Sequence, residues 1–208
     1  MASRVGQLHV LTDPRGGQAA LEAVAAAVAA GAPVVQVRQK NCTDRALCDF
    51  AAAVADICAA FEATCLINDR VDVALAVGAA GTHLGAEDLP VEAARRVAGP
   101  DHLIGGTARN PRQARELVAA GADYLGVGPA YATRTKSGLP DPIGPAGVQA
   151  VAEAVSVPVI AISGVTVERV SELLAAGAWG VAVTAAVSGA PDPAAATRRF
   201  LEELGGAG

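Results

Sequence analysis

The stretch Ala30-Gly31-Ala32-Pro33-Val34-Val35-Gln36-Val37 contains the junction that decides the fold. An alanine-rich, helix-like run precedes it, and a glycine directly after a helix readily takes the left-handed conformation that closes the last turn. The β-branched residues that follow favour a strand. This stretch therefore predicts a helix that ends near Gly31 and leads directly into a buried strand.

The same phrase returns three more times, each time between a helix-like run and a strand-like run. The further copies are Ala80-Gly81-Thr82, Ala120-Gly121-Ala122 and Ala176-Gly177-Ala178. Periodicity across the whole chain predicts strands near residues 8–11, 34–37, 66–67, 82–84, 103–105, 124–127, 159–162 and 181–183. The predicted helices lie near residues 18–29, 44–61, 71–77, 91–97, 111–119, 145–155, 167–175 and 193–204.

Eight strands that alternate with eight helices in 208 residues give 26 residues for each unit. Such alternation implies parallel strands joined by right-handed crossovers. We therefore expect an α/β fold, a (β/α)₈ TIM barrel, as a single domain over residues 1–208 with a frayed tail at 205–208. An open doubly wound sheet is the alternative. It usually carries Gly-x-Gly-x-x-Gly after its first strand, and the segment Leu8–Leu11 is followed by Thr12-Asp13-Pro14 instead.

Composition excludes several classes of function. The net charge of −5 argues against a surface for nucleic acid or for anionic membranes, so an anion site would have to be a local cationic pocket. The four cysteines have no spacing suited to zinc, and they are typical of thiols in a reducing cytosol. No secretory signal and no membrane-spanning stretch is predicted, so we expect a cytoplasmic location.

The second predicted strand changes from apolar to polar at every second residue. Side chains alternate along a strand, so Gln36, Arg38 and Lys40 are expected to point the same way, about 6.6 Å apart. An unpartnered buried cation costs several kcal/mol, which favours a polyanionic ligand at this position. A solvated edge strand is the alternative interpretation.

Carboxylates follow the next two predicted strands. Asp69 ends the third strand and Asp88 lies in the loop after the fourth. Two carboxylates with open coordination commonly hold Mg²⁺ when a phosphate supplies the remaining oxygens. Either residue could instead be a helix N-cap. Their position beside the cationic strand favours a metal site.

A long loop after the sixth strand predicts a phosphate site. Thr133-Arg134-Thr135-Lys136 brings hydroxyls and an ammonium group into a segment too long for a simple connection. Gly164 and the segment Thr184-Ala185 end the seventh and eighth strands, where barrels of this type often bind phosphate through backbone N–H groups. A solvated loop remains the alternative.

The histidines carry weaker signals. His83 lies among apolar neighbours, which is more typical of a hydrogen-bonded core or supporting histidine than of a catalyst, and His9 and His102 are expected to be structural or exposed. Gly126-x-Gly128 lacks a third glycine and precedes Pro129, so a dinucleotide loop is disfavoured.

The chain resembles the thiamine phosphate synthase family over nearly its whole length. The matching phrases are Gln36-x-Arg38-x-Lys40, Asn68-Asp69-Arg70-x-Asp72, His83-Leu84-Gly85-x-x-Asp88-Leu89-Pro90, Gly121-Ala122-Asp123-Tyr124, Gly128-Pro129, Thr133-x-Thr135-Lys136 and Gly180-Val181-Ala182-Val183, with the segment Leu8 to Asp13. Their order and spacing together are specific. This family is a (β/α)₈ barrel that joins a hydroxymethylpyrimidine diphosphate to a thiazole phosphate and releases pyrophosphate with Mg²⁺.

The resemblance implies roles for particular residues. Those expected to hold the pyrimidine diphosphate are Gln36, Arg38, Lys40, Asn68, Thr107 and Lys136, among which Arg38, Lys40 and Lys136 would stabilise the departing diphosphate. Asp69 and Asp88 would bind Mg²⁺. The thiazole phosphate would be held by Thr133, Thr135, Gly164, Thr184 and Ala185.

Four positions depart from the family pattern. Thr107 replaces a usual Ser, Arg109 replaces a frequent His, Ser163 replaces a second Gly, and Ala185 replaces a Ser that meets the phosphate. Two rival functions remain: a thiazole phosphate tautomerase of the same fold, and a non-catalytic ligand-binding barrel. The expected partners are small phosphorylated substrates, and alanine-rich helix faces would also permit a homodimer.

Overall fold

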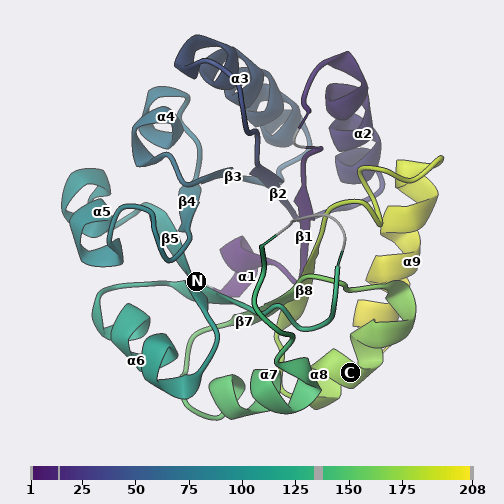
Figure 1. The fold of residues 1–208 in the computed structure, drawn as a ribbon. Helices are drawn as coiled ribbons and strands as arrows, with labels where there is room; N and C mark the ends of the chain where they lie inside the picture. The colour runs from purple at the N-terminus through teal and green to yellow at the C-terminus, as the bar shows by residue number, and fades with distance from the viewer. Residues whose placement is uncertain (1, 14, 134–137, 207–208) are drawn as a thin grey trace.

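The computed structural model describes residues 2–13, 15–133 and 138–206. In this part of the chain eight parallel strands pair in sequence order, and β8 pairs with β1 to close a barrel (Figure 1). The strands are β1 (Leu8–Leu11), β2 (Val34–Val37), β3 (Thr64–Asn68), β4 (Gly81–Leu84), β5 (Leu103–Ala108), β6 (Tyr124–Val127), β7 (Val159–Ile162) and β8 (Gly180–Val183). The predicted single-domain (β/α)₈ barrel is confirmed.

Helices form a ring outside the strands (Figure 1). They are α2 (Gln18–Ala29), α3 (Asp44–Ala60), α4 (Val71–Ala76), α5 (Val91–Ala98), α6 (Pro111–Ala119), α7 (Gly144–Ala152), η1 (Val167–Arg169) with α8 (Val170–Ala175), and α9 (Pro193–Gly205). The predicted helix at 167–175 therefore begins as a 3₁₀ turn. Helix α9 includes Gly205, which was expected in the tail, and residues 207–208 lie outside the described part.

Three of the four repeated glycines have the left-handed backbone conformation that the sequence predicted. Gly31, Gly121 and Gly177 have φ of 101°, 101° and 83°, the left-handed conformation that ends a helix. Gly81 is different because it is the first residue of β4, and Gly78 takes the positive φ of 66° instead. A side chain at Gly81 would collide with the Leu103 carbonyl oxygen of β5, so this glycine permits close strand packing.

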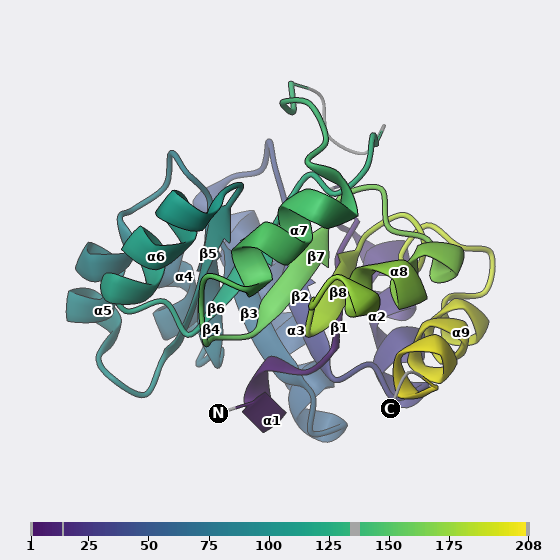
Figure 2. The ribbon, with the colours of Figure 1, turned by 90° about the horizontal axis from the view of Figure 1, so that it is seen from below.

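A short helix that the sequence did not predict closes the lower end of the barrel. Helix α1 (Ala2–Val5) lies below the strands, at the end where they begin (Figure 2). Val5 is buried in a cluster that fills the barrel interior, together with Val34, Leu66, Leu103, Tyr124, Ile160 and Ala182. His9 contacts the Val5 carbonyl at this end, whereas Gln36, His83 and Thr107 lie toward the carboxyl ends of their strands.

No helix in the described ranges is both long enough and apolar enough to cross a bilayer.

Candidate active site

Two carboxylates meet at the carboxyl ends of β3 and β4. Asp69 directly follows β3, and its side chain shares a hydrogen bond with that of Asp88 in the loop after β4. The backbone of Asp69 has φ of 66°, which is uncommon for a residue with a side chain, and its N–H donates to the His83 carbonyl at 2.8 Å. Asp88 is fixed in turn, because its Oδ2 accepts the Gly85 N–H at 2.6 Å. The chain thus holds both carboxylates in fixed positions.

The electrostatics of Asp69 show which charges surround it. Burial, together with the hydrogen bond and the charge of Asp88, raises the pKa of Asp69 to about 6. The charges of Lys40 and Arg38 act in the opposite direction. Two carboxylates, of Asp69 and Asp88, and two cationic side chains therefore lie near one another. They follow three successive strands, β2, β3 and β4. A raised carboxylate pKa of this kind, with named charged neighbours, is typical of functional sites.

Arg38 and Lys40 were predicted to lie on one face of the second strand, and the structure places them elsewhere. Strand β2 ends at Val37, so Arg38 and Lys40 belong to the following loop and not to the strand. Thr12, which is fully buried, explains the change, because its Oγ1 accepts the Arg38 N–H at 2.9 Å. Gln36 remains in the strand and is buried, as its place in the apolar pattern implied.

Neither carboxylate caps a helix. The N-cap of α4 is Arg70 and that of α5 is Pro90, and neither cap makes a side-chain hydrogen bond. The alternative interpretation of Asp69 and Asp88 as N-caps is therefore wrong.

The donor chemistry of this pair suits a hard cation. In the described ranges no group of three or more His, Cys, Asp or Glu side chains is arranged to hold a metal ion. Asp69 and Asp88 offer carboxylate oxygens that lie close together, and their mutual repulsion contributes to the raised pKa of Asp69. Such a pair fits Mg²⁺, which usually takes one or two carboxylates and completes its octahedron with phosphate oxygens and water.

A buried polar group lies beneath these charges. His83 of β4 contacts the Tyr124 hydroxyl through Nδ1 at 3.1 Å and the Thr107 hydroxyl through Nε2 at 3.0 Å. Burial lowers the pKa of His83 to about 4, so its imidazole is neutral at physiological pH. The prediction of a hydrogen-bonded core histidine is confirmed. His9 and His102 are likewise buried and hydrogen-bonded, to the Val5 carbonyl and to Thr82.

The chain turns sharply where β7 and β8 end, and the residues there are partly buried or exposed. Ser163 and Gly164 have φ of 72° and 68°, so two successive residues adopt the left-handed region. A Cβ at Gly164 would lie 2.6 Å from the Ala132 carbonyl oxygen, which leaves no room for a side chain. After β8, the chain turns so that the Thr184 carbonyl accepts N–H groups from residues 187 and 188. Among the described hydrogen bonds none uses the N–H of Ala185 or of Ala186.

The loop after β6 is described only in part. The structure places Thr133, and Thr135 and Lys136 lie outside the described residues. The described parts of this loop rise beyond the end of the barrel opposite α1 (Figure 2).

Two residues that the sequence did not single out support Gly164. Arg169 of η1 donates to the Gly164 carbonyl, and its guanidinium lies 4.1 Å from the centre of the Tyr131 ring. The Tyr131 hydroxyl donates to Glu172 of α8. These contacts join the β6 loop to the segment after β7. No local motif predicts the contacts of Tyr131, because Arg169 and Glu172 lie about forty residues further along the chain.

The predicted residues thus form two groups at one end of the barrel. The first surrounds the carboxylate pair and contains Arg38, Lys40, Asp69 and Asp88, with Gln36 and Thr107 in the polar layer below and Asn68 at the end of β3. The second lies at the ends of β6 to β8 and contains Thr133, Gly164, Thr184 and Ala185.

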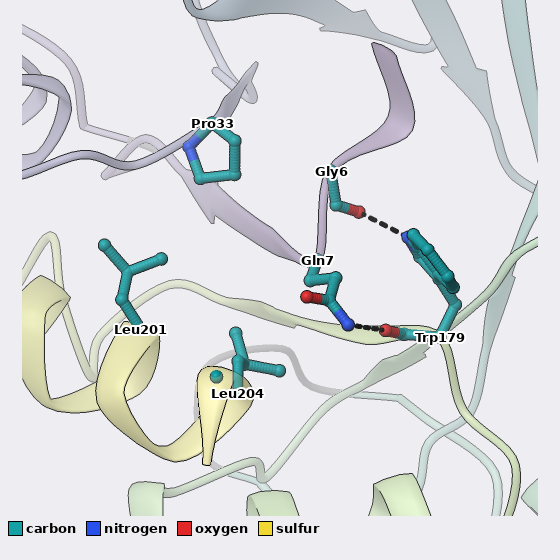
Figure 3. A pocket seen from close by; sticks show the side chains of 7 residues that line it. Gly6, Gln7, Pro33, Trp179, Leu201 and Leu204 are labelled. Carbon is teal, nitrogen blue, oxygen red and sulfur yellow. Dashed lines mark hydrogen bonds between the residues drawn. The ribbon is translucent and has the colours of Figure 1, made fainter. Parts of the chain in front are cut away.

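A separate pocket of about 420 Å³ lies at the opposite end, beside the start of β1 (Figure 3). Pro33, Leu201 and Leu204 line it, and the Trp179 indole donates to the Gly6 carbonyl at 3.1 Å. None of the described residues that line this pocket has a titratable side chain, so it has no acid or base for chemistry.

Comparison with known proteins identifies related chains. A family model described as thiamine monophosphate synthase matches residues 8–187. A thiamine-phosphate synthase from Salinispora arenicola is 58% identical over 205 residues, which cover 97% of this chain and 99% of that protein. A thiamine-phosphate synthase from Moorella thermoacetica is 42% identical over 193 residues, with 93% and 92% covered.

Solved structures give the same result. A thiamine phosphate pyrophosphorylase from Pyrococcus furiosus has a TM-score of 0.90 and 34% identity, and the match covers 99% of this chain and 98% of that one. A 3-hexulose-6-phosphate synthase has a TM-score of 0.70 at 20% identity, a likeness that extends to the fold alone.

Proposed function

Because the chain belongs to the thiamine monophosphate synthase family, its activity is that of a thiamine-phosphate synthase, a transferase, and we propose how its residues carry out the reaction. The substrates are a hydroxymethylpyrimidine diphosphate and a thiazole phosphate, or the carboxylated form of the latter. The observation that carries the proposal is the meeting of Asp69 and Asp88 with Arg38 and Lys40 at one rim of the barrel. This arrangement suits a polyanion together with a divalent cation.

The chemistry begins with heterolysis of the bond between the pyrimidine methylene carbon and the diphosphate oxygen. The electron pair leaves with the diphosphate, and a pyrimidine cation remains. The thiazole nitrogen then attacks this carbon and forms the new C–N bond. No strong base and no covalent nucleophile is needed, so the main task of the protein is to stabilise a departing polyanion.

Arg38 and Lys40 perform this task from the loop after β2. A cation about 4 Å from the developing charge contributes ~4 kcal/mol at an effective dielectric of 20. Thr12 fixes the Arg38 backbone, so the guanidinium approaches from a defined position. Lys136 has the same role by its place in the family motif. Asn68 and Thr107 add hydrogen bonds to the diphosphate.

Mg²⁺ held by Asp69 and Asp88 would supply further neutralisation of the departing diphosphate when bound. These two residues have a second effect, because their carboxylates offset the charge of Arg38 and Lys40 before substrate arrives.

The thiazole phosphate is held at the second group of residues. Gly164 and the N–H groups of Ala185 and Ala186, which make no hydrogen bond to another described residue, offer backbone donors, and Thr133, Thr135 and Thr184 offer hydroxyls. Backbone N–H groups at the ends of the last strands commonly bind phosphate in barrels of this type.

A tautomerase needs a proton-transfer group at the reacting carbon. In the described part of the site the histidine is His83, and both of its ring nitrogens are already engaged by Tyr124 and Thr107. This favours coupling over isomerisation.

The test mixes purified protein with both phosphorylated substrates and follows pyrophosphate with and without Mg²⁺. Release that needs both substrates and the metal is the expected result. Isomerisation of the thiazole phosphate alone, or binding without turnover, would contradict the proposal.

We also propose that the protein works in the cytoplasm. Cys42, Cys48, Cys58 and Cys65 are free thiols, which is typical of a reducing compartment.

A further inference from the structure

A line of polar contacts crosses the barrel interior beneath the carboxylate pair. It runs from Thr107 of β5 to His83 of β4 at 3.0 Å, and from His83 to the Tyr124 hydroxyl of β6 at 3.1 Å. The Gln36 side chain of β2 makes a hydrogen bond with the same Tyr124 hydroxyl. Both ends of this line, Gln36 and Thr107, are proposed substrate contacts. The two middle residues are fully interior and have no assigned role.

The barrel leaves room for this line at two glycines. A Cβ at Gly105 would lie 2.6 Å from His83 Nδ1 and would also collide with the Tyr124 ring. A Cβ at Gly126 would lie 2.8 Å from His83 Cε1. Any side chain at these two positions would displace the imidazole and the phenol from their contact. The chain therefore gives up side-chain packing in two adjacent strands to accommodate His83 and Tyr124.

The chemistry of the middle residues allows only two arrangements of protons. A neutral imidazole has one donor nitrogen and one acceptor nitrogen, and a phenol has a single proton. If Tyr124 donates to His83 Nδ1, then Nε2–H donates to Thr107, and the phenol oxygen accepts from the Gln36 amide N–H. If Tyr124 donates to Gln36 instead, every hydrogen bond along the line is reversed.

The charge at the rim selects the first arrangement. Thr107 lies on the interior face of β5 toward the carboxyl end, where Arg38 and Lys40 are proposed to hold a diphosphate. A diphosphate oxygen can only accept a hydrogen bond at neutral pH, so the Thr107 hydroxyl must donate to it. It can do so only if it accepts from His83. One of the two Gln36 N–H groups then donates to Tyr124, which fixes the rotation of the amide and leaves its carbonyl oxygen as an acceptor for the ligand.

We propose that His83 and Tyr124 are positioning residues that fix the direction of Gln36, so that its amide oxygen selects a pyrimidine with an exocyclic amino group over one with an oxo group. This inference rests on the proposed function for the identity of the ligand. Its new content is the source of the selectivity, which is a buried hydrogen-bonded line and not the contact residue alone. An amide without Tyr124 could rotate and offer its N–H to an oxo group as readily.

The variant Tyr124→Phe removes one hydroxyl and keeps the ring in place. The matched control is Thr82→Val, which deletes another buried hydroxyl that contacts a histidine, His102, at 2.9 Å on the same strand as His83. Thr82 alternates with His83 along β4 and so faces away from the barrel interior. Melting temperatures establish that both variants fold.

The experiment compares the aminopyrimidine diphosphate with its 4-oxo counterpart, by kcat/KM and by calorimetric binding in Mg²⁺. We expect Tyr124→Phe to reduce the preference for the amine about tenfold, mainly through the KM for the pyrimidine, with the KM for the thiazole phosphate unchanged. Thr82→Val keeps the original preference. A Tyr124→Phe protein with an unchanged preference overturns the inference, as does an equal loss in Thr82→Val.

If the proposed function were wrong, the result would differ from a failure of the inference about His83 and Tyr124. The unchanged protein would then release no pyrophosphate with either pyrimidine. Calorimetry would still compare the affinities for the two diphosphates, and a lack of preference in the unchanged protein would overturn the inference by itself.

Discussion

The side chains of Asp69 and Asp88 share a hydrogen bond at the rim of the barrel, although they belong to the ends of two different strands. A left-handed backbone conformation at Asp69 and the Gly85 N–H on Asp88 hold them in this contact. Two partly buried carboxylates that lie close together repel one another when both are ionised, so this arrangement is explained by function and not by stability. A positive φ in a residue with a side chain supports the same interpretation.

Replacing Asp69 by Asn should therefore stabilise the metal-free protein. The folded-state pKa of Asp69 is about 6, above the value of 3.8 expected for the unfolded chain. Between these values the folded state keeps the proton that the unfolded state loses, so stability falls as the pH rises from about 4 to about 6. Asn removes this penalty and tolerates positive φ. We expect a higher melting temperature at pH 7 in EDTA, together with loss of Mg²⁺-dependent activity.

Asp72→Asn is the matched control for that substitution. Asp72 pairs with Arg70 at 2.6 Å, and this hydrogen bond lowers the pKa of Asp72. Its replacement should leave the melting temperature unchanged or slightly lower. A lower melting temperature for Asp69→Asn would contradict the account of the carboxylate pair.

The requirement for Mg²⁺ should increase at acid pH. A proton on Asp69 competes with the metal, so the concentration of Mg²⁺ that gives half-maximal activity should rise about tenfold for each pH unit below 6. Above pH 7 it should be nearly constant. Titrations of Mg²⁺ from pH 5 to pH 8 measure this dependence, and a flat profile would exclude Asp69 as a ligand that must lose its proton.

Removal of a cation next to the diphosphate should slow the chemical step. We expect Arg38→Ala and Lys136→Ala each to lower kcat by two to three powers of ten, because ~4 kcal/mol of transition-state stabilisation is partly lost. Arg96→Ala serves as the control, since Arg96 is exposed on α5 and its ion pair in the described part of the chain is with Glu92. Full activity of Lys136→Ala at saturating substrate would remove Lys136 from the chemistry.

A side chain at Gly164 should weaken binding of the thiazole phosphate. Ala at this position has to adopt φ of 68° and would press against the Ala132 carbonyl. We expect a higher KM for the thiazole phosphate and an unchanged KM for the pyrimidine diphosphate. Gly99→Ala also introduces a side chain at a positive φ, 78°, but with no heavy atom within 4 Å, and should leave both KM values unchanged.

A hydroxyl at position 185 should strengthen the same subsite. Ala185 is exposed, so Ser can be accommodated there without burial of an unpartnered polar group. One added hydrogen bond to phosphate is expected to lower the KM for the thiazole phosphate by three- to tenfold, about 1 kcal/mol. Steady-state kinetics with the pyrimidine diphosphate held at saturation measure the change. An unchanged or higher KM would mean that the phosphate is bound elsewhere.

Much of the fold could be predicted because its signals are local. Four glycine junctions preceded four of the strands, and strand-like runs elsewhere in the chain predicted the other four, since helix ends and buried strands depend on neighbouring residues. Helix α1 was missed because four residues carry no periodicity, and its burial depends on the barrel above it. The left-handed residue of this junction was expected at Gly81 but is Gly78. Gly81 instead lies in β4, where it packs closely against Leu103.

The site could be predicted at the level of strand ends but not of contacts. Parallel strands bring their carboxyl ends together, so Arg38, Asp69 and Asp88 could be placed at one rim from sequence alone. The loop position of Arg38 depends on Thr12, twenty-six residues earlier. The line through His83 and Tyr124 joins residues forty-one positions apart and leaves no pattern in the sequence.

A crystal structure with pyrophosphate and Mg²⁺ would show whether these four side chains form one site. We expect pyrophosphate oxygens on Arg38 and Lys40, and a metal ion bound by Asp69, Asp88 and the pyrophosphate. Pyrophosphate bound away from these four residues, with the carboxylates free of metal, would contradict this expectation.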